Sequence, residues 1–401
     1  RAMRAGPMGA FEGAMERRGC RGAGTVLSMV PVLGSFAMAI GYSVVVGWII
    51  RYTVGTFTGA TLAPETVDGF WGAFGTAATG TNNLGFHLAA LIISFLILVF
   101  GVSKGIENSN KSFMPVFFAL FIAIAIYVST LSGAADGYRY MFQISDWSQL
   151  LSGNMWKYAL GQAFFSLSLG MSIMITYGSY LKKEENLTKN TVIICGMDTL
   201  VALIAGFIIV PAVFATLGAE GVGKGAGFAF SSLAGVFQQM PGGQIFGILF
   251  YLLLLFAALT SCISLLEGVV AFVTERFGWK RTATTVILGI IMFIIGCVYT
   301  CSQAAFDIKG VWFDFKNGFT TPIFGDFMEF LTDRLLIPIS ALGACLFVGW
   351  AWKPQNAIRE IEMDGKPFGL KGAYSFLVKY LAPICIIVII VASFATGTTL
   401  S

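Results

Sequence analysis

The segment Gly161–Tyr180, GQAFFSLSLGMSIMITYGSY, combines an apolar run long enough to cross a membrane with polar residues at its centre. Ser166, Ser168 and Gly170 fall near the middle, where two hydroxyls and a glycine are unsuited to a plain lipid-facing helix. Unwound backbone at that depth is tolerated only where protein or water satisfies its polar groups. Interrupted helices of this kind form substrate and ion sites near the membrane midplane in secondary transporters. The segment is therefore predicted to be a broken helix that contributes to such a site.

Carboxylates inside predicted spans are the next candidates, because a charge in the membrane interior is costly and usually serves a function. Asp198, in CGMDTLVALIAG, is either a cation ligand or fixed counter-charge, or a side chain that reaches the interface. Glu267, in TSCISLLEGVVAF, presents the same alternatives. Glu329 and Asp333 are four residues apart on one helix face, where a solvated helix end is the alternative to a functional pair.

Oxygen-bearing positions also share one face of the segment LFAALTSCISLLEG. Ala257, Thr260 and Ser261 follow the i, i+3, i+4 spacing of a helix. One backbone carbonyl and two hydroxyls there could contribute to a sodium site, since hard cations take oxygen ligands. Ser and Thr also join membrane helices through hydrogen bonds, so simple helix packing is the alternative.

Composition assigns the class of protein. Hydrophobic residues make up 56% of the 401 residues, charged residues 11%, and the mean hydropathy is +0.80. A soluble domain would carry about 25% charged residues. The sequence therefore predicts an all-α polytopic membrane protein with a single transmembrane domain over residues 1–401. Nine apolar runs have the length of membrane spans, near residues 25–51, 85–103, 113–131, 156–180, 191–217, 243–272, 284–301, 327–352 and 374–396.

Basic residues orient these spans. If the start of the chain is cytoplasmic, 18 of the 25 Lys and Arg residues fall on the inner side, as the positive-inside rule favours. Residues 1–24 then form a cytoplasmic loop, and the protein is predicted to be a multi-pass protein of the cell membrane (inner or plasma membrane). The loop has neither an initiator Met nor the apolar core of a signal peptide, so it is predicted to follow an upstream segment.

Signals for catalysis are absent from the sequence. The seven cysteines are scattered without a CxxC, and the single histidine, His87, cannot build a metal site. No HExxH or GxSxG motif occurs, and no aspartate pair has protease spacing. The sequence therefore predicts a protein that is not an enzyme, has no catalytic residues or organic cofactor, and binds no nucleic acid.

Several segments, in matching order and spacing, resemble the neurotransmitter:sodium symporter family, whose bacterial members include LeuT. They are SKGIE at Ser103–Glu107, GAADG at Gly133–Gly137, GQAFFSLSLG at Gly161–Gly170, ITYGSY at Ile175–Tyr180 and FAALTS at Phe256–Ser261. The resemblance implies a LeuT-type inverted-repeat fold in which the nine spans are family helices three to eleven. Helix one and most of helix two would be missing before Arg1, and residues 1–24 would follow those missing helices.

The resemblance also implies site residues by position. Residues matching the substrate site are Met38, Tyr42, Phe165, Ser168, Met171, Ser261 and Leu265, with Tyr42 facing the substrate α-carboxylate. Residues matching sodium ligands are Ser166 and Asp198 in a first site, and Ala257, Thr260 and Ser261 in a second. Residues matching the outer gate are Phe165, as an aromatic lid, and Glu329, which would pair with an Arg of helix one.

These matches imply a secondary active transporter that couples Na⁺ to the uptake of a small-molecule amino acid across the lipid bilayer. Met38, Met171 and Leu265 would make a roomy apolar pocket, which favours a hydrophobic or aromatic amino acid. Asp198 stands where the family often has Asn, and a fixed carboxylate there favours chloride-independent transport. The alternatives are a proton-coupled amino-acid carrier of the same fold and a transport-inactive membrane receptor or scaffold. The retained oxygens of Thr260 and Ser261 favour sodium coupling over both.

Overall fold

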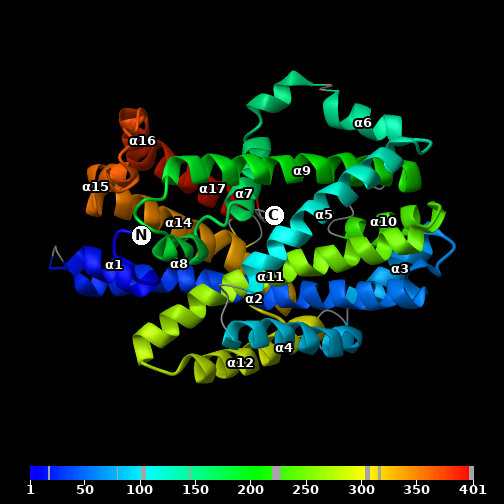
Figure 1. Cartoon of the computed structure of the whole chain (residues 1–401), viewed down its shortest axis with the longest axis horizontal. Helices are drawn as coiled ribbons and strands as arrows, with labels where there is room; N and C mark the ends of the chain where they lie inside the picture. Colours follow the sequence, from blue (N-terminus) through cyan, green and yellow to red (C-terminus); the bar gives the residue numbers. More distant parts are fainter. Residues whose placement is uncertain are drawn as a thin grey trace.

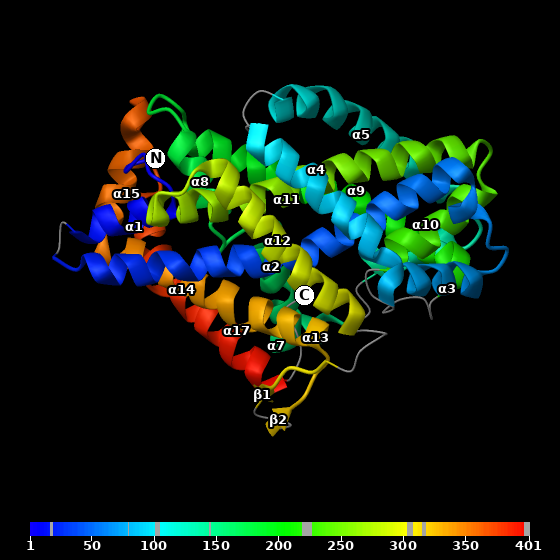
Figure 2. The same ribbon diagram turned by 90° about the horizontal axis from the view of Figure 1, so that it is seen from below.

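The apolar runs fold into long helices joined mostly by short connections, as the computed structural model shows (Figures 1 and 2). The structure describes residues 1–16, 19–78, 80–100, 105–143, 146–218, 227–302, 308–314 and 318–396. The first two residues of the SKGIE motif, most of the glycine-rich segment before Gly227, and the last five residues lie outside this description.

The helices follow one another in the order of the predicted spans, with shorter helices in the connections. The α-helices are α1 (Pro7–Glu16), α2 (Arg21–Thr58), α3 (Val67–Ala78), α4 (Leu84–Phe100), α5 (Gly105–Ser129), α6 (Ala134–Phe142), α7 (Gly153–Ser166), α8 (Ile173–Tyr180), α9 (Leu187–Leu217), α10 (Phe228–Gln239), α11 (Gly243–Phe277), α12 (Arg281–Ser302), α13 (Phe324–Phe330), α14 (Ile337–Leu346), α15 (Pro354–Ile361), α16 (Lys371–Phe376) and α17 (Ala382–Thr396).

Smaller elements complete the chain. The 3₁₀ turns are η1 (Ala60–Leu62), η2 (Gly80–Asn83), η3 (Trp147–Leu151) and η8 (Glu362–Asp364), and the π-helical turns are η6 (Leu331–Leu336), η7 (Phe347–Ala351) and η9 (Leu377–Leu381). Two short strands, β1 (Trp312–Asp314) and β2 (Gly318–Thr320), pair in an antiparallel hairpin. The π turns lie inside the last two predicted spans, so each of those spans is several consecutive helical pieces.

Seven of the described helical segments are long and apolar enough to cross a membrane, and they match seven of the nine predicted spans. An eighth arises if Met114–Ser129 and Ala134–Phe142, which meet at a bend of 108°, count as one span. The predicted span 113–131 corresponds to the first half of that bent pair. The predicted span 156–180 corresponds to α7 and α8 with a break between them. The protein therefore has the multi-pass helical architecture that its composition predicts.

The predicted loop 1–24 contains a helix. α1 packs against the start of α2, where the Thr25 hydroxyl donates to Glu12 Oε1 at 2.6 Å and Arg21 Nε donates to Glu12 Oε2 at 3.1 Å. The Thr25 hydroxyl, with help from Arg21, lowers the pKa of the Glu12 carboxyl. The placement of this segment in the cytoplasm stays a prediction.

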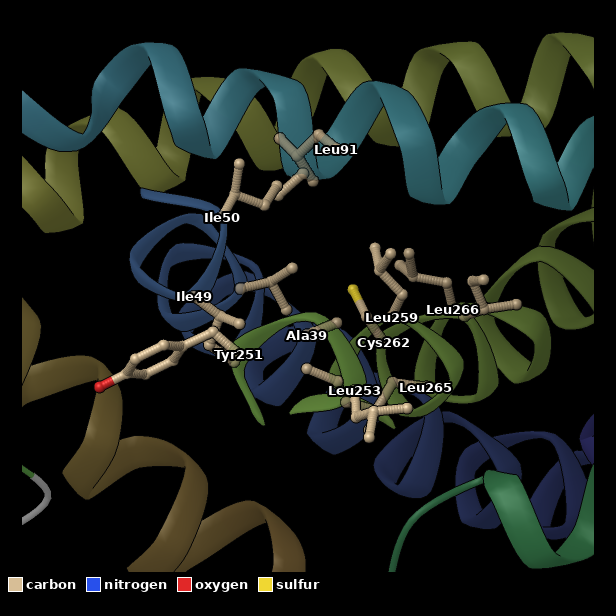
Figure 3. Packing of buried hydrophobic residues seen from close by; sticks show 14 of the residues in the cluster. Ala39, Ile49, Ile50, Leu91, Tyr251, Leu253, Leu259, Cys262, Leu265 and Leu266 are labelled. Carbon is tan, nitrogen blue, oxygen red and sulfur yellow. The ribbon is translucent and has the colours of Figure 1, made fainter. Parts of the chain in front are cut away.

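The core forms where α2 and α11 pack along each other, with α4 and α12 against α2 (Figure 3). Ala39, Leu91, Leu259 and Leu266 meet in this core and are at most 8% exposed. Because both long helices are apolar around much of their circumference, they can be buried inside the bundle. Near the predicted outer end of α2, the Thr53 hydroxyl donates to the Ile49 carbonyl of its own helix at 2.7 Å and also lies 3.3 Å from the Tyr251 carbonyl of α11.

His87 joins α4 to α2 inside the core. Its side chain is fully buried, and Nε2 lies 3.0 Å from Ser43 Oγ. The Ser43 hydroxyl already donates to the Ile40 carbonyl at 2.7 Å, so His87 must hold its proton on Nε2 and donate to Ser43. The buried imidazole therefore acts as an interhelical link between α4 and α2.

Candidate functional site

The predicted break in the Gly161–Tyr180 segment is present. α7 ends at Ser166 and α8 begins at Ile173. Two residues between them have left-handed backbone, Ser168 with φ +54° and Gly170 with φ +76°. A Cβ on Gly170 would lie 2.5 Å from the Ile337 carbonyl oxygen, so the position requires glycine for both space and conformation. Left-handed backbone at Ser168 costs about 1–2 kcal/mol, which the surrounding packing must offset.

The break brings Ser166, the last residue of α7, to Asp198 on α9. The Ser166 hydroxyl donates to Asp198 Oδ1 at 2.6 Å, and both residues are partly buried. Two residues 32 positions apart in sequence thus present a hydroxyl and a carboxylate oxygen at one point. Oxygen ligands of this type suit a hard monovalent cation.

The second predicted sodium site is organised along α11. The Thr260 hydroxyl donates to the Ala257 carbonyl at 2.9 Å, so these two predicted ligand oxygens are adjacent. The Ser264 hydroxyl in turn donates to the Thr260 carbonyl at 2.8 Å and lies 2.9 Å from the Tyr177 hydroxyl of α8. The helix after the break is therefore connected to the α11 face that carries the predicted ligands.

A further contact fixes the start of α8. Ser35 of α2 accepts the Ser172 backbone N–H at 2.8 Å and the Ser172 hydroxyl at 2.9 Å, and both serines are fully buried. A Cβ on Gly268 of α11 would lie 2.3 Å from Ser172 Oγ, so this glycine gives α8 room to approach α11. Ser35 supplies a hydrogen bond to a backbone N–H that the first turn of a helix otherwise leaves unsatisfied.

Replacing Ser35 with alanine removes the acceptor of both Ser172 donors. We expect Ser35→Ala to lower stability by about 1–3 kcal/mol, because two buried donors lose their partner. Thermal unfolding of the purified protein in detergent would measure this as a lower midpoint. Ser129→Ala is the matched control, because the exposed Ser129 hydroxyl bonds only its own helix, at the Ile126 carbonyl. Equal midpoints for the two variants would contradict the role given to Ser35.

The predicted substrate residues lie on α2, α11 and the break. Tyr42 and Met38 of α2 pack against the core, and Ser261 of α11 is a polar neighbour of the Tyr42 hydroxyl. Met171 and Leu265 belong to the same core cluster, and each is only 4% exposed. Ser168 is held at the left-handed turn of the break. The predicted pocket residues thus come from helices that pack together, with Met171 and Leu265 buried and Met38 and Tyr42 partly buried.

The two predicted gate residues lie on different elements, Phe165 on α7 and Glu329 on α13. Phe165 is 45% exposed and, with Asp333, Ile337 and Ile389, lines a mainly apolar cavity of about 120 Å³. Glu329 lies one turn before Asp333 and accepts a hydrogen bond from the Tyr299 hydroxyl at 2.8 Å. This bond gives the Glu329 carboxylate a partner on α12 that the sequence did not indicate.

Glu267 forms an ion pair with Arg281. Arg281 at the start of α12 donates to both Glu267 oxygens, at 3.1 and 2.5 Å, and the Tyr180 hydroxyl donates to Oε1 at 2.9 Å. The Glu267 side chain is 5% exposed and that of Arg281 is 37% exposed. The carboxylate therefore joins α11 to the end of α8 and the start of α12, and is neither a free ligand nor a solvated interfacial side chain.

Several polar groups of the site could not be identified from the sequence. Ser35, Ser172, Tyr177 and Ser264 pair across helices that are far apart in the chain. Their signal in the sequence is weak: Ser264 follows Thr260 by one helical turn, and Ser172 closes the polar stretch of the break. Within the described residues, no group of three or more His, Cys, Asp or Glu side chains could hold a metal ion. The oxygens available for a cation are therefore mostly hydroxyls and carbonyls.

A model of the sodium:neurotransmitter symporter family matches residues 73–400. The chain belongs to this family. Its members are sodium-coupled symporters, so Na⁺ is a co-substrate, and this symporter is a multi-pass membrane protein and not an enzyme. The match covers four-fifths of the chain and includes the break in Gly161–Tyr180 and the α11 face.

Individual relatives agree with this assignment. The symporter is 31% identical to an uncharacterised sodium-dependent transporter of Bacillus subtilis, over 94% of this chain and 81% of the relative. It is also 31% identical to an uncharacterised sodium-dependent transporter of Haemophilus influenzae, over 92% of this chain and 79% of the relative. It is 27% identical to a sodium-dependent nutrient amino acid transporter of Drosophila grimshawi, over 77% of this chain and 47% of the relative.

A solved structure shares the whole fold. The crystal structure of MhsT in complex with L-phenylalanine matches with a TM-score of 0.85 and 34% identity, covering 98% of this chain and 86% of MhsT. The predicted LeuT-type fold is therefore confirmed.

Proposed function

We propose that this symporter couples Na⁺ to the uptake of a hydrophobic or aromatic amino acid into the cell, without a requirement for chloride. The observation that carries the proposal is the 2.6 Å contact of Ser166 with Asp198 beside the broken helix. Support for the substrate class comes from the apolar Met38, Met171 and Leu265, and from the similarity to MhsT, which was crystallised with L-phenylalanine.

In this proposal, one set of residues binds the sodium ions and another set binds the substrate. Ser166 and Asp198 bind one Na⁺, and the Ala257 carbonyl with Thr260 and Ser261 binds a second. The Tyr42 hydroxyl donates to the substrate α-carboxylate, while Met38, Ser168, Met171 and Leu265 contact its side chain and Phe165 covers it. Na⁺ close to the α-carboxylate lowers the cost of holding that charge away from water. Each ligand then raises the affinity of the other by the same factor, which couples the two.

Asp198 also determines the charge balance of the site. A carboxylate beside the first Na⁺ offsets the charge of the cation without a bound anion, so no chloride is needed. The sodium gradient then provides the driving force, together with the membrane potential at about 2.3 kcal/mol per charge for each 100 mV.

Ion replacement in proteoliposomes tests the coupling. We expect uptake of radiolabelled phenylalanine by the full-length protein to stop when choline replaces external Na⁺, and to continue when gluconate replaces Cl⁻. Uptake that persists in choline and follows a proton gradient would instead support a proton-coupled carrier. Uptake that stops in gluconate would contradict the chloride-independent mechanism.

Competition tests the substrate class. Unlabelled leucine, phenylalanine and tryptophan are expected to inhibit uptake more strongly than glycine or glutamate, because Met and Leu side chains favour apolar ligands. Stronger inhibition by glycine or by a charged amino acid would contradict the proposed pocket.

A further inference from the structure

The β1–β2 hairpin lies in the connection between α12 and α13, at the end of the bundle where α17 also ends (Figure 2). Its register pairs Trp312 with Thr320 and Phe313 with Phe319. Because successive side chains of a strand point to opposite faces, Trp312 lies on one face while Phe313 and Phe319 lie together on the other.

The Trp312 face is held against the bundle. Trp312 is 8% exposed, and its ring stacks on Phe394 of α17 with centroids 5.7 Å apart and planes 17° apart. It also contacts Phe330 of α13, with centroids 5.9 Å apart. The hairpin is therefore attached by a tryptophan to the ends of two helices.

The opposite face presents apolar side chains outward. Phe313 lies beside Phe319 with ring centroids 5.1 Å apart, and Val311 shares their face by strand alternation. Val311 is 65% exposed, Phe313 41% and Phe319 80%. Large apolar side chains grouped on one face of a short hairpin are costly in water, which points to an apolar environment around them.

The neighbouring helix surface identifies that environment. In the span Lys371–Ala392, only 17% of the most apolar stretch is buried by the described residues. Its exposed side chains include Ile384, Ile387, Val388 and Val391 of α17, which leads to Phe394. The Trp312–Phe394 stack thus places the hairpin at the end of a surface that faces lipid. Aromatic residues are enriched where a membrane meets water.

We propose that the hairpin face formed by Val311, Phe313 and Phe319 inserts into the interface of the adjoining phospholipid leaflet. The occupant of this face is the bilayer itself. The contact anchors the start of α13, which carries Glu329, at a fixed depth.

A spin label measures this depth directly. Phe319→Cys and, separately, the loop control Glu65→Cys are made in a Cys20→Ser parent, because Cys20 is exposed. Each protein is labelled and reconstituted into phosphatidylcholine vesicles, and the signal of the labelled parent is subtracted. Power saturation then compares relaxation by oxygen, which concentrates in lipid, with relaxation by a water-soluble nickel chelate.

The proposal predicts that oxygen relaxes the label at position 319 more strongly than the nickel chelate does, with the reverse order at position 65. A Phe319→Trp variant should gain emission that brominated phosphatidylcholine quenches, which tests the same contact without a label. Dominant nickel relaxation at both positions would place the face in water and overturn the proposal. Protection of position 319 from both reagents, with dipolar broadening, would identify a second copy as the partner and would also overturn it.

Discussion

Replacing Asp198 with alanine is expected to abolish sodium-dependent uptake while the protein remains folded. Asp198 supplies the carboxylate at the contact with Ser166, and a Na⁺ bound there would lose this charged ligand. A charge-assisted contact of about 3 kcal/mol corresponds to about a 100-fold loss of affinity. Because sodium and substrate affinities are coupled, the apparent substrate affinity should fall as well. Substrate binding measured over a sodium titration, together with uptake, would record both losses.

Two variants sharpen this result. Asp198→Asn keeps a ligand oxygen and removes the charge, so we expect a sodium affinity between those of Asp198→Ala and the parent. Thr199→Ala is the matched control, because the exposed Thr199 hydroxyl bonds only the Cys195 carbonyl of its own helix at 2.8 Å. A sodium dependence unchanged in Asp198→Ala, or equally reduced in Thr199→Ala, would remove Asp198 from the first sodium site.

Replacing Arg281 with methionine is expected to lower the stability of the folded protein by breaking its ion pair with Glu267. The change leaves the Glu267 carboxylate, 5% exposed, with the Tyr180 hydroxyl as its hydrogen-bond partner among the described residues. Breaking a buried ion pair costs about 3–5 kcal/mol, and the 37% exposure of the Arg281 side chain reduces the expected loss to about 1–3 kcal/mol. Thermal unfolding in detergent would show a lower midpoint.

A double variant distinguishes the effect of the unpaired Glu267 charge from the effect of losing the packing of the Arg281 side chain. With Glu267→Gln added to Arg281→Met, the uncompensated charge is gone, so most of the lost stability should return. Arg276→Met, at an exposed arginine in the last turn of α11, is the control for removing a positive charge at this end of the helix. If the double variant were less stable than Arg281→Met alone, the loss would lie in the packing of Arg281 and not in the ion pair.

The sequence predicted the parts of the site that depend on order along the chain. Ser166, Ser168 and Gly170 signalled the break because two hydroxyls and a glycine interrupt an apolar run, and the backbone turns there. The spacing of Ala257 and Thr260 predicted a shared helix face, where their oxygens are adjacent. Hydropathy located the long spans for the same reason, since the bilayer imposes their length.

Contacts between distant segments could not be predicted in this way. Nothing in the local sequence pairs Ser35 with Ser172, because the bond depends on how closely α8 approaches α2 beside Gly268. Glu267 remained ambiguous for the same reason, since its partner Arg281 lies in the next helix. The direction of the chain after the 108° bend at Ser129 and the π turn over Leu331–Leu336 depend equally on packing against neighbouring helices.

The length of α2 has one further consequence. Ser35, which receives the start of α8, and Thr53, which lies beside the Tyr251 carbonyl, are carried by the same continuous helix, about 27 Å apart along its axis. The length of α2 between these two residues therefore sets the distance between the break before α8 and the part of α11 that carries Tyr251. A single residue inserted between Ser35 and Thr53 would rotate one contact by about 100° around the helix axis relative to the other. The two attachments could then no longer be made at once, so natural length variation should be excluded from this part of the chain and confined to its loops.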